Sequence, residues 1–316
     1  MDFKERLKMG KKIVVVGSSN TDMIIKVPWL PKPGETVLGG KFFTAAGGKG
    51  ANQAVAAARA GGDVIFLARI GDDMFGQKAR EGFIKDNINV DYVLTDDNEP
   101  SGVALILVAP DGENVIAVAG GANSNLSPSD VEKQSDLISS ADILLGQLET
   151  PLETIHKAVS IASENGVKVI LNPAPAQQLS DDILGKISIL TPNESEAQLL
   201  TGIEVDSPED ASKAADVLMD KGVETVLLTM GARGAYIATS QFKELIPGFE
   251  VEAVDATAAG DVFNGALAVA IADNMPIREA VSFANAAAAL SVTKLGAQPS
   301  APTKEEVDKF FKSQEN

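Results

Sequence analysis

The chain has 316 residues, of which 45% are hydrophobic and 22% charged, and it carries a formal net charge of −17. This composition is typical of a globular protein with one large domain or two smaller ones. The negative charge argues against broad binding to nucleic acid or to an anionic membrane, because both need a basic surface. The sequence contains no cysteine, which excludes disulfides, thiolate nucleophiles and Cys-ligated zinc.

Residues 1–11 are charged and contain no apolar core, so they indicate a short N-terminal extension and not a signal peptide. No stretch of the sequence approaches a membrane span, which predicts a cytoplasmic protein. The single histidine, His156, cannot build a His-rich metal site. We therefore expect any catalysis to depend on carboxylates, lysines, hydroxyls, backbone dipoles or a bound metal.

Short apolar strands alternate with helices along most of the chain. Continuous apolar strands separated by helices are typical of a parallel sheet that is covered on both faces. The pattern therefore predicts an α/β sandwich with a mostly parallel central sheet. The expected strands are 13–16, 64–69, 142–145, 168–171, 187–190 and 224–228, and the expected helices are 50–61, 75–87, 151–165 and 208–221.

Two segments interrupt this alternation. Residues 23–44 are rich in proline and glycine, and residues 102–119 predict two strands around the turn Pro110-Asp111-Gly112. Neither segment has a helix to pair with, so we expect the two to form a small projecting β-sheet. Such a sheet serves as a lid over a cleft or as an oligomer contact, because its apolar face needs cover.

Two common phosphate-binding motifs are absent. Gly48-Lys49-Gly50 lacks the Ser or Thr that follows the lysine of a P-loop, and Phe43 stands where that motif needs glycine. After the first strand, Ser19 and Asp22 occupy positions where a dinucleotide fingerprint requires glycine. The sequence therefore favours neither a P-loop enzyme nor a dinucleotide-dependent oxidoreductase.

Polar residues collect instead where strands end and helices begin. The carboxyl edge of an open α/β sheet is where ligands usually bind. Carboxylate acceptors combined with lysine and amide donors suit a ligand with several hydroxyls, so the sequence predicts a sugar pocket at this edge. Its candidate residues are Asn20, Asp22, Lys49, Asn52 and Glu149.

Residues 258–265, Ala-Ala-Gly-Asp-Val-Phe-Asn-Gly, open the most apolar helical stretch of the chain. Backbone N–H groups at such a turn, together with the helix dipole, can hold a phosphate beside the carboxylate of Asp261. The alternative is that Asp261 only caps its helix. Because a helix N-terminus favours the ionised form of a carboxyl group, we expect Asp261 to be a weak base that acts late in the reaction.

Two further turns are candidates for contact with a nucleotide. Asn193 and Glu196 lie three residues apart at the start of a predicted helix, where they would share one face. Residues 229–234, Thr-Met-Gly-Ala-Arg-Gly, follow strand 224–228, and their two glycines permit close approach of a ligand to the backbone. A plain turn between strands is the alternative for this second segment.

The order of these segments resembles that of the ribokinase (PfkB-type) carbohydrate kinase family. The two long signatures are Gly-Gly-Lys-Gly-Ala-Asn-Gln-Ala at 47–54 and Asp-x-x-Ala-Ala-Gly-Asp-x-Phe-Asn-Gly-Ala at 255–266, and shorter similar segments lie at 19–22, 33–36, 171–176, 191–197 and 294–300. The resemblance covers about residues 12–312. It implies a three-layer ribokinase-like α/β domain, a β lid formed by 23–44 and 102–119, and a homodimer made by clasped lids.

The resemblance also implies roles for individual residues. Asp261 would take the proton from O5 of the sugar, and Ala258, Ala259 and Gly260 would form an anion hole. Ribose would be held by Asn20, Asp22, Gly48, Lys49, Asn52 and Glu149. ATP would contact Asn193, Thr229, Met230, Gly231, Ala232, Arg233, Gly234, Gly260, Asp261 and Asn285.

Two metal ions follow from the same resemblance. Glu196 would steer Mg²⁺ indirectly. A monovalent cation, K⁺, would lie beside the anion hole and use mostly backbone carbonyls of Asp255, Thr257, Ser291, Lys294, Gly296 and Ser300. Ala256 departs from the family pattern, which usually has threonine at this position, so one local hydrogen bond is in doubt.

The implied activity is ATP-dependent phosphorylation of D-ribose at O5. A deoxyribose or nucleoside kinase is the alternative within the family, although the chain has only two Tyr and one Trp to form a platform for a base. A non-catalytic sugar-binding protein on this fold is a further alternative. The intact Ala-Ala-Gly-Asp sequence that ends at Asp261 argues against it.

Overall fold

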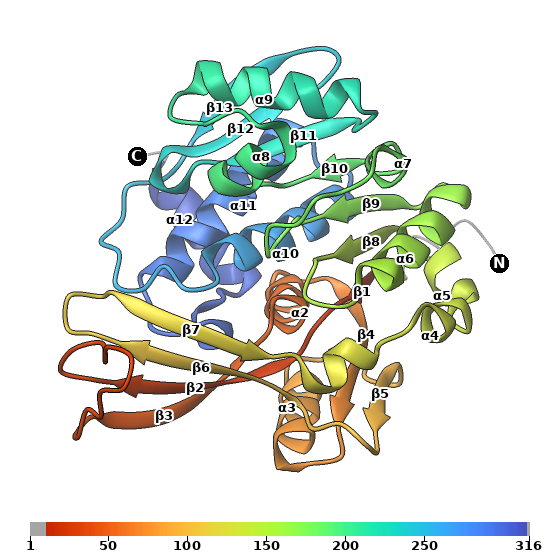
Figure 1. Ribbon diagram of the computed structural model, residues 1–316. Helices are drawn as coiled ribbons and strands as arrows, with labels where there is room; N and C mark the ends of the chain where they lie inside the picture. Colours follow the sequence, from red (N-terminus) through yellow and green to blue (C-terminus); the bar gives the residue numbers. More distant parts are fainter. Residues whose placement is uncertain (1–10, 315–316) are drawn as a thin grey trace.

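A computed structural model describes residues 11–314, so the predicted N-terminal extension lies almost entirely outside the described residues. A nine-stranded sheet with the order β13-β12-β11-β10-β9-β8-β1-β4-β5 forms the centre of the molecule (Figure 1). Neighbouring strands are parallel except at β12, which is antiparallel to both β11 and β13. The predicted mostly parallel sheet is therefore confirmed.

The observed elements follow the predicted alternation closely. The strands of the large sheet are β1 (Lys12–Val16), β4 (Asp63–Gly71), β5 (Val93–Asp96), β8 (Ile143–Gly146), β9 (Lys168–Leu171), β10 (Ile189–Leu190), β11 (Thr225–Thr229), β12 (Gly234–Ala238) and β13 (Lys243–Pro247). The helices are α2 (Lys49–Arg59), α3 (Met74–Lys85), α4 (Pro128–Glu132), α5 (Ser135–Ser139), α6 (Leu152–Glu164), α7 (Asp181–Leu184), α8 (Glu194–Thr201), α9 (Pro208–Asp220), α10 (Ala259–Ala272), α11 (Ile277–Val292) and α12 (Lys304–Gln314). The strand predicted at 187–190 is shorter than expected and keeps only two residues.

The alternation of side chains along each strand produces two cores. Ile13 and Val15 of β1 pack into the core that contains α2, α10 and α11, whereas Val14 and Val16 pack into the core that contains α6, α8 and α9. Successive strand residues point to opposite faces, so a wholly apolar strand needs helices on both sides. The three-layer arrangement follows from this requirement.

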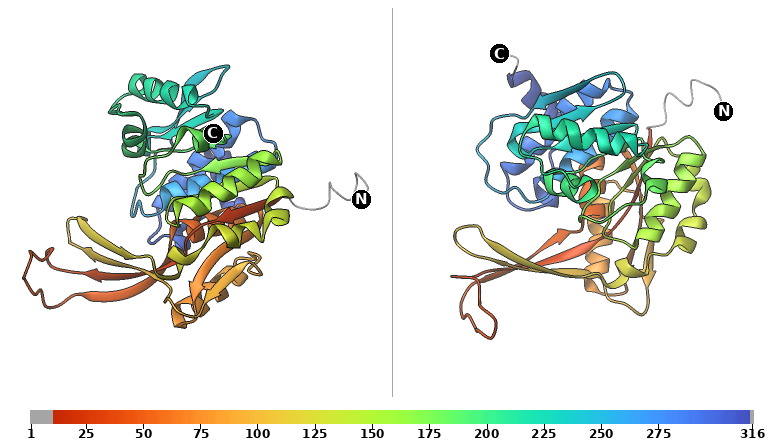
Figure 2. Two further views of the ribbon diagram at one scale, coloured as in Figure 1. Left: turned by 45° about the vertical axis from the view of Figure 1, so that its right-hand side comes forward. Right: turned by 45° about the horizontal axis from the view of Figure 1, so that its top comes forward.

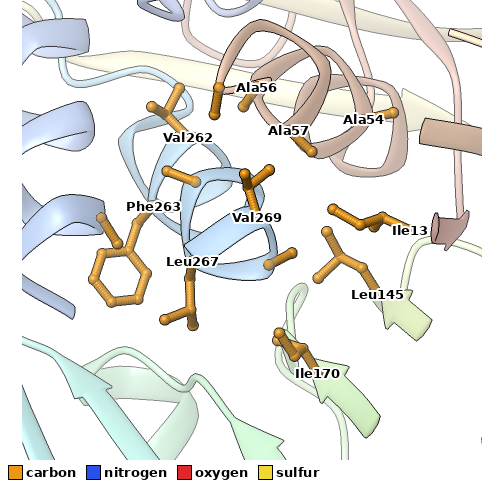
Figure 3. Packing of buried hydrophobic residues seen from close by; sticks show 14 of the residues in the cluster. Ile13, Ala54, Ala56, Ala57, Leu145, Ile170, Val262, Phe263, Leu267 and Val269 are labelled. Carbon is orange, nitrogen blue, oxygen red and sulfur yellow. The ribbon is translucent and has the colours of Figure 1, made fainter. Parts of the chain in front are cut away.

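Helix α10 is the central element of one helical layer. Figure 3 shows it packed over Ile13, Leu145 and Ile170, which belong to three neighbouring strands, and against α2. The two helices approach closely at Gly265, where a Cβ atom would lie 2.6 Å from the Cβ of Ala56. This close approach brings the first turns of α2 and α10 together, and these turns carry the two long signatures.

We expect Gly265→Ala to lower the free energy of unfolding by about 1–3 kcal/mol, because the added methyl group overlaps α2 and forces the helices apart. Urea denaturation followed by circular dichroism measures the change. Gly82→Ala on α3 is the matched control, since a Cβ atom there would meet no atom within 4 Å. Equal free energies of unfolding for the two variants would show that α2 and α10 can move apart without loss of stability.

A second sheet projects from the body of the molecule (Figures 1 and 2). It has the order β3-β2-β6-β7 and consists of β2 (Asn20–Lys26), β3 (Lys41–Gly47), β6 (Gly102–Val108) and β7 (Asn114–Ala119). The predicted projecting sheet is confirmed. Residues 27–40 form no strand, since the prolines in this stretch cannot donate to a ladder. Among residues 11–314, no helix is long and apolar enough to cross a membrane.

Candidate active site

A cavity of about 400 Å³ lies at the carboxyl ends of β9, β10 and β11, beside the first turns of α2 and α10. This is the edge of the sheet at which the sequence predicted ligand binding. The polar side chains that line the cavity include Lys49, Asn172, Thr191, Asn193, Glu196 and Asp261.

The turn that precedes α10 presents unpaired backbone N–H groups. Ala258 adopts a left-handed conformation with φ of 61°, which few residues other than glycine accept without strain. Within the described part of the chain, the N–H groups of Gly260 and Asp261 make no hydrogen bond, and that of Ala259 makes only a long one of 3.3 Å to the carbonyl of Ala256. Free N–H groups at a helix N-terminus form a binding site for an anion.

Asp261 lies on the first turn of α10 and is buried. Its Oδ2 accepts a hydrogen bond from Nδ2 of Asn52 at 3.0 Å, and its Oδ1 accepts one from Nε2 of Gln53 at 3.0 Å. Burial raises the pKa of Asp261, although Lys49 and the two amides oppose this change. Burial therefore acts on Asp261 in the direction opposite to that expected from the helix N-terminus, and the prediction of an unusually weak base is not supported.

Three carboxylates from distant parts of the sequence meet in this region. Burial, followed by the charges of Glu149 and Asp261, raises the pKa of Asp22 to about 6. Glu149 accepts hydrogen bonds from the backbone N–H of Lys49 at 2.9 Å and from Oγ of Ser18 at 2.5 Å. Carboxylates coupled by like charge in this way would be stabilised by added hydrogen-bond donors, such as the hydroxyls of a ligand.

Two glycines of the first signature allow this convergence. A Cβ atom at Gly47 would lie only 2.3 Å from a carboxylate oxygen of Asp22, so the glycine makes room for that side chain. Gly48 has φ of 88°, and a Cβ atom there would lie 2.6 Å from the backbone nitrogen of Asn20. The Gly-Gly pair therefore brings the start of α2 against the start of β2.

Several residues of the site were not identified from the sequence. Asn123 donates to Oδ1 of Asn20 at 2.8 Å and accepts from the backbone N–H of Ser19 at 2.9 Å, which fixes the start of β2. Ser18 holds Glu149 in the same region. Asn123 belongs to no recognisable motif, so the sequence gives no indication of its role. Gln53 lies next to Asn52 inside the first signature and could have been identified as a candidate from that position.

Asn193 and Glu196 lie together at the start of α8, where Asn193 stands just before the helix and not within it. Asn193 is the N-cap: its Oδ1 accepts from the N–H of Glu196 at 2.8 Å, and Oε2 of Glu196 accepts from the N–H of Asn193 at 2.9 Å. This reciprocal capping box positions both side chains at the cavity. Burial raises the pKa of Glu196.

The segment 229–234 reaches the cavity only in part. Thr229, Gly231 and Gly234 line it, whereas the side chain of Met230 is buried in the hydrophobic core. Arg233 does not line the cavity but pairs with Glu194, which does, at 3.2 Å. The segment forms a short 3₁₀ turn, Gly231–Arg233. The residue types alone do not indicate which side chains of such a turn point toward the cavity.

Of the remaining predicted residues, those of the anion-binding turn and Asn285 line the cavity, whereas the predicted cation-site residues are not among its lining residues. Asn285 lines it and donates through Nδ2 to the backbone carbonyls of Ile246 and Pro247 at the end of β13. Asp255 accepts from the N–H and hydroxyl of Thr257 and from the N–H of Gly296 at 2.8 Å. Although burial opposes the change, these bonds lower the pKa of Asp255.

The predicted cation-site side chains are otherwise engaged. Ser291 and Ser300 donate to the carbonyls of Ala288 and Ala297, and Lys294 pairs with Glu306. Within residues 11–314, no group of three or more His, Cys, Asp or Glu side chains is arranged to hold a metal ion. Any cation at this position would therefore depend on backbone carbonyls.

A buried carboxylate beside free N–H groups, with a cluster of acceptors facing it, has the parts needed for phosphoryl transfer to a hydroxyl. The fold and the site thus define a class, that of small-molecule kinases with an α/β sandwich. The chain belongs to the pfkB family of carbohydrate kinases, whose sequence profile matches residues 10–304.

Individual relatives agree with this assignment. The chain is 49% identical to a ribokinase of Haemophilus influenzae over 303 residues, which are 96% of this chain and 99% of that protein. It is 37% identical to a deoxyribokinase of Salmonella typhi, with 95% and 98% of the two chains covered. The structure of Arabidopsis thaliana ribokinase complexed with ribose and ATP is similar with a TM-score of 0.89, 35% identity, and 96% and 99% coverage.

Proposed function

We propose that this chain transfers the γ-phosphoryl group of ATP to O5 of D-ribose. The observation that carries the proposal is the position of Asp261, which is buried on the first turn of α10 beside unpaired N–H groups and is coupled by charge to Asp22 and Glu149. The similarity to ribokinases over nearly the whole chain supports ribose as the acceptor.

The sugar would lie between the start of β2 and the first turn of α2. Asp22 and Glu149 would accept hydrogen bonds from its hydroxyls, while Lys49 and Asn20 would donate to them. Oδ1 of Asn52 is buried and has no hydrogen-bond partner in the described part of the chain. A sugar hydroxyl would supply that partner, and Gly48 would allow the ring to approach the backbone.

Transfer would proceed in line. The O5 oxygen attacks Pγ, its proton passes to a carboxylate oxygen of Asp261, and the bond from Pγ to the β–γ bridging oxygen breaks to release ADP. The turn Ala258–Asp261 would hold the transferred group by backbone N–H groups, those of Gly260 and Asp261 being unpaired. Burial raises the pKa of Asp261, which favours proton uptake.

Two cations would support this reaction. Glu196 has one carboxylate oxygen in its capping box, and the other would act indirectly on Mg²⁺ by orienting water around the ion, which would neutralise charge on the nucleotide phosphates. Asp255 ties the loop before α10 to Gly296, so carbonyls of these two loops would hold K⁺ beside the anion-binding turn. Thr229, Gly231 and Asn285 would contact the nucleotide.

A nucleotide-coupled kinase assay with ribose, 2-deoxyribose, other pentoses and nucleosides tests the acceptor. We expect ribose to give the highest kcat/KM. The deoxyribokinase relatives make 2-deoxyribose the specific alternative, and a higher kcat/KM for it would replace ribose in the proposal. Absence of phosphoryl transfer to any member of the panel would favour a sugar-binding protein.

The projecting sheet would act as a lid and join two copies of the chain. Both of its faces expose large apolar side chains that are more than half exposed: Phe42, Leu105 and Val115 on one face, and Ile116 and Val118 on the other. Such a surface needs a partner, and a second copy supplies one of matching character by twofold symmetry.

We therefore expect a dimer at micromolar concentration in light scattering. Val115 and Ile116 point to opposite faces of β7, so Val115→Asp and Ile116→Asp test one face each. The substitution on the face that contacts the second copy is expected to give monomers. The substitution on the opposite face serves as its control. A wild-type monomer with full activity would contradict the clasped lid.

A further inference from the structure

We propose that Gln53 is a positioning residue that fixes the orientation of Asp261 and connects it to the anion-binding turn. The proposal rests on the proposed function of Asp261 as the base. It assigns a role to a side chain that contacts neither the sugar nor the nucleotide.

Gln53 is fully buried, and its whole amide group is engaged. Nε2 donates to Oδ1 of Asp261 at 3.0 Å and to Oδ1 of Asn172 at 3.1 Å, while Oε1 accepts from Nε2 of Gln147 at 2.7 Å. Both amide hydrogens and the oxygen therefore have partners, and the side chain has no second arrangement that would keep them.

A backbone carbonyl determines the direction of these hydrogen bonds. Nδ2 of Asn172 donates to the carbonyl of Thr191 at 3.1 Å, and a carbonyl can only accept. Oδ1 of Asn172 must then face Gln53, so Gln53 must present its NH₂ group to Asn172 and to Asp261. The donor to the carboxylate is thus set by the network and is not an arbitrary choice between amide orientations.

The same network continues to the anion-binding turn. Oγ1 of Thr191 donates to Oδ1 of Asn264 at 2.6 Å, and Nδ2 of Asn264 donates to the carbonyl of Gly260 at 2.8 Å. The base and the turn that would bind the transferred group are therefore held relative to each other through side chains at the ends of β9 and β10. Gln53 is the member that attaches the carboxylate to this frame.

Adjacent residues of α2 divide the two carboxylate oxygens between them. Asn52 holds Oδ2 of Asp261 and belongs to the proposed sugar pocket, whereas Gln53 holds Oδ1 from the protein interior. A sugar hydroxyl that approaches from the Asn52 side would meet Oδ2. Gln53 would thus direct the basic oxygen toward O5 without touching the substrate.

Charged groups also face Asp261, and Gln53 acts in addition to them. Lys49 favours the ionised carboxylate, while Glu149 disfavours it. Asp22 and Glu196 are coupled to Asp261 by like charge. Gln53 is a neutral donor that favours the ionised form, so its removal should raise the pKa of Asp261 while these four charges stay in place.

The test compares wild type with Gln53→Met, which keeps the length of the side chain and removes its donors. A hydrogen bond to a charged group corresponds to roughly a tenfold change in equilibrium. We expect kcat at pH 7 to fall at least about tenfold and the acid limb of the kcat–pH profile to move up by about one unit. KM for ATP should stay within about threefold. Because the profile is measured at saturating ribose and ATP, it reports the base in the substrate complex.

Two further variants separate positioning from folding. Thr154→Val removes another fully buried hydrogen bond, from Oγ1 to the carbonyl of Leu126, away from the cavity. It should lower stability without moving the acid limb. Gln53→Glu keeps the volume and the acceptor for Gln147, and it decides the question if Gln53→Met does not fold. Its carboxyl group lies beside that of Asp261, so the acid limb should move up in this variant as well.

An unchanged acid limb in either Gln53 variant that folds would overturn the proposal, as would an equal shift in Thr154→Val. These outcomes differ from failure of the proposed function. That failure would appear as a wild-type protein without sugar kinase activity, or as activity that does not depend on Asp261.

Discussion

Asp261→Asn is expected to lower kcat by about 10²–10⁴-fold, which is the usual contribution of general acid–base catalysis. The substitution keeps the shape of the side chain but removes the charge that would accept the O5 proton. Affinities for ribose and ATP should change little, because the anion-binding turn is backbone and the sugar keeps Asp22 and Glu149. Steady-state kinetics for both substrates, with isothermal titration of ribose, measure the separation of kcat from binding.

The pH dependence gives a second measurement of the same substitution. Burial raises the pKa of Asp261, so wild-type kcat should fall on the acid side as this carboxylate takes up a proton. The residual activity of Asp261→Asn should lose that limb. Asp273→Asn, at the exposed C-terminal end of the same helix, is the control and should behave as wild type. A kcat of Asp261→Asn within about threefold of wild type would mean that Asp261 is not the base.

The fold could be predicted from the sequence because one signal dominates each element. A wholly apolar strand such as Ile13–Val16 requires helices on both faces, and the proline-rich stretch 27–40 cannot continue a strand. Strands β12 and β13 were not predicted. The antiparallel pairing of β12 with β11 depends on the turn at Gly231–Arg233, which looks like any glycine-containing turn in the sequence.

The site could be predicted only where a local pattern carries the chemistry. Ala258, Gly260 and Asp261 stand together in one short signature, so their proximity is encoded locally. The partners that hold the site do not stand together: Gln53 and Asp261 are 208 residues apart, and Ser19 and Asn123 are 104 apart. Such pairs arise from the packing of strands and helices, and no spacing in the sequence reports them.

The basicity of Asp261 shows the same difference between local and tertiary effects. The helix N-terminus is a local feature that favours the ionised form, and the sequence indicates it directly. Burial is a tertiary effect, produced when α2 packs against α10 at Gly265, and it acts in the opposite direction on the pKa of Asp261. Only the packed structure shows that Asp261 is buried and that burial raises its pKa.

Asp22→Ala is expected to raise KM for ribose roughly tenfold to a hundredfold, with a smaller effect on kcat. The carboxylate of Asp22 would accept hydrogen bonds from ribose hydroxyls, and a hydrogen bond to a charged group contributes about 1.5–3 kcal/mol. Isothermal titration of ribose measures the loss directly. Asp22→Asn, which keeps the shape of the side chain, should lose less affinity. Unchanged ribose binding in Asp22→Ala would exclude Asp22 from the sugar pocket.

The same carboxylate should destabilise the protein without its ligand. The pKa of Asp22 is about 6 in the folded chain, because of burial and then the charges of Glu149 and Asp261, and about 4 when unfolded. The folded state therefore holds the proton more tightly, and wild-type stability should fall as pH rises from about 4 to 6. At pH 7, Asp22→Asn should be more stable than wild type by about 1–2 kcal/mol, allowing for partial exposure.

Urea denaturation at pH 4 and pH 7 measures this gain in stability, which should disappear at the lower pH. A stability difference that does not depend on pH would show that the gain does not come from the charge of Asp22. If the charge is responsible, the affinity for sugar hydroxyls and the instability of the empty pocket have one origin: three carboxylates held together with too few donors until a ligand brings its own.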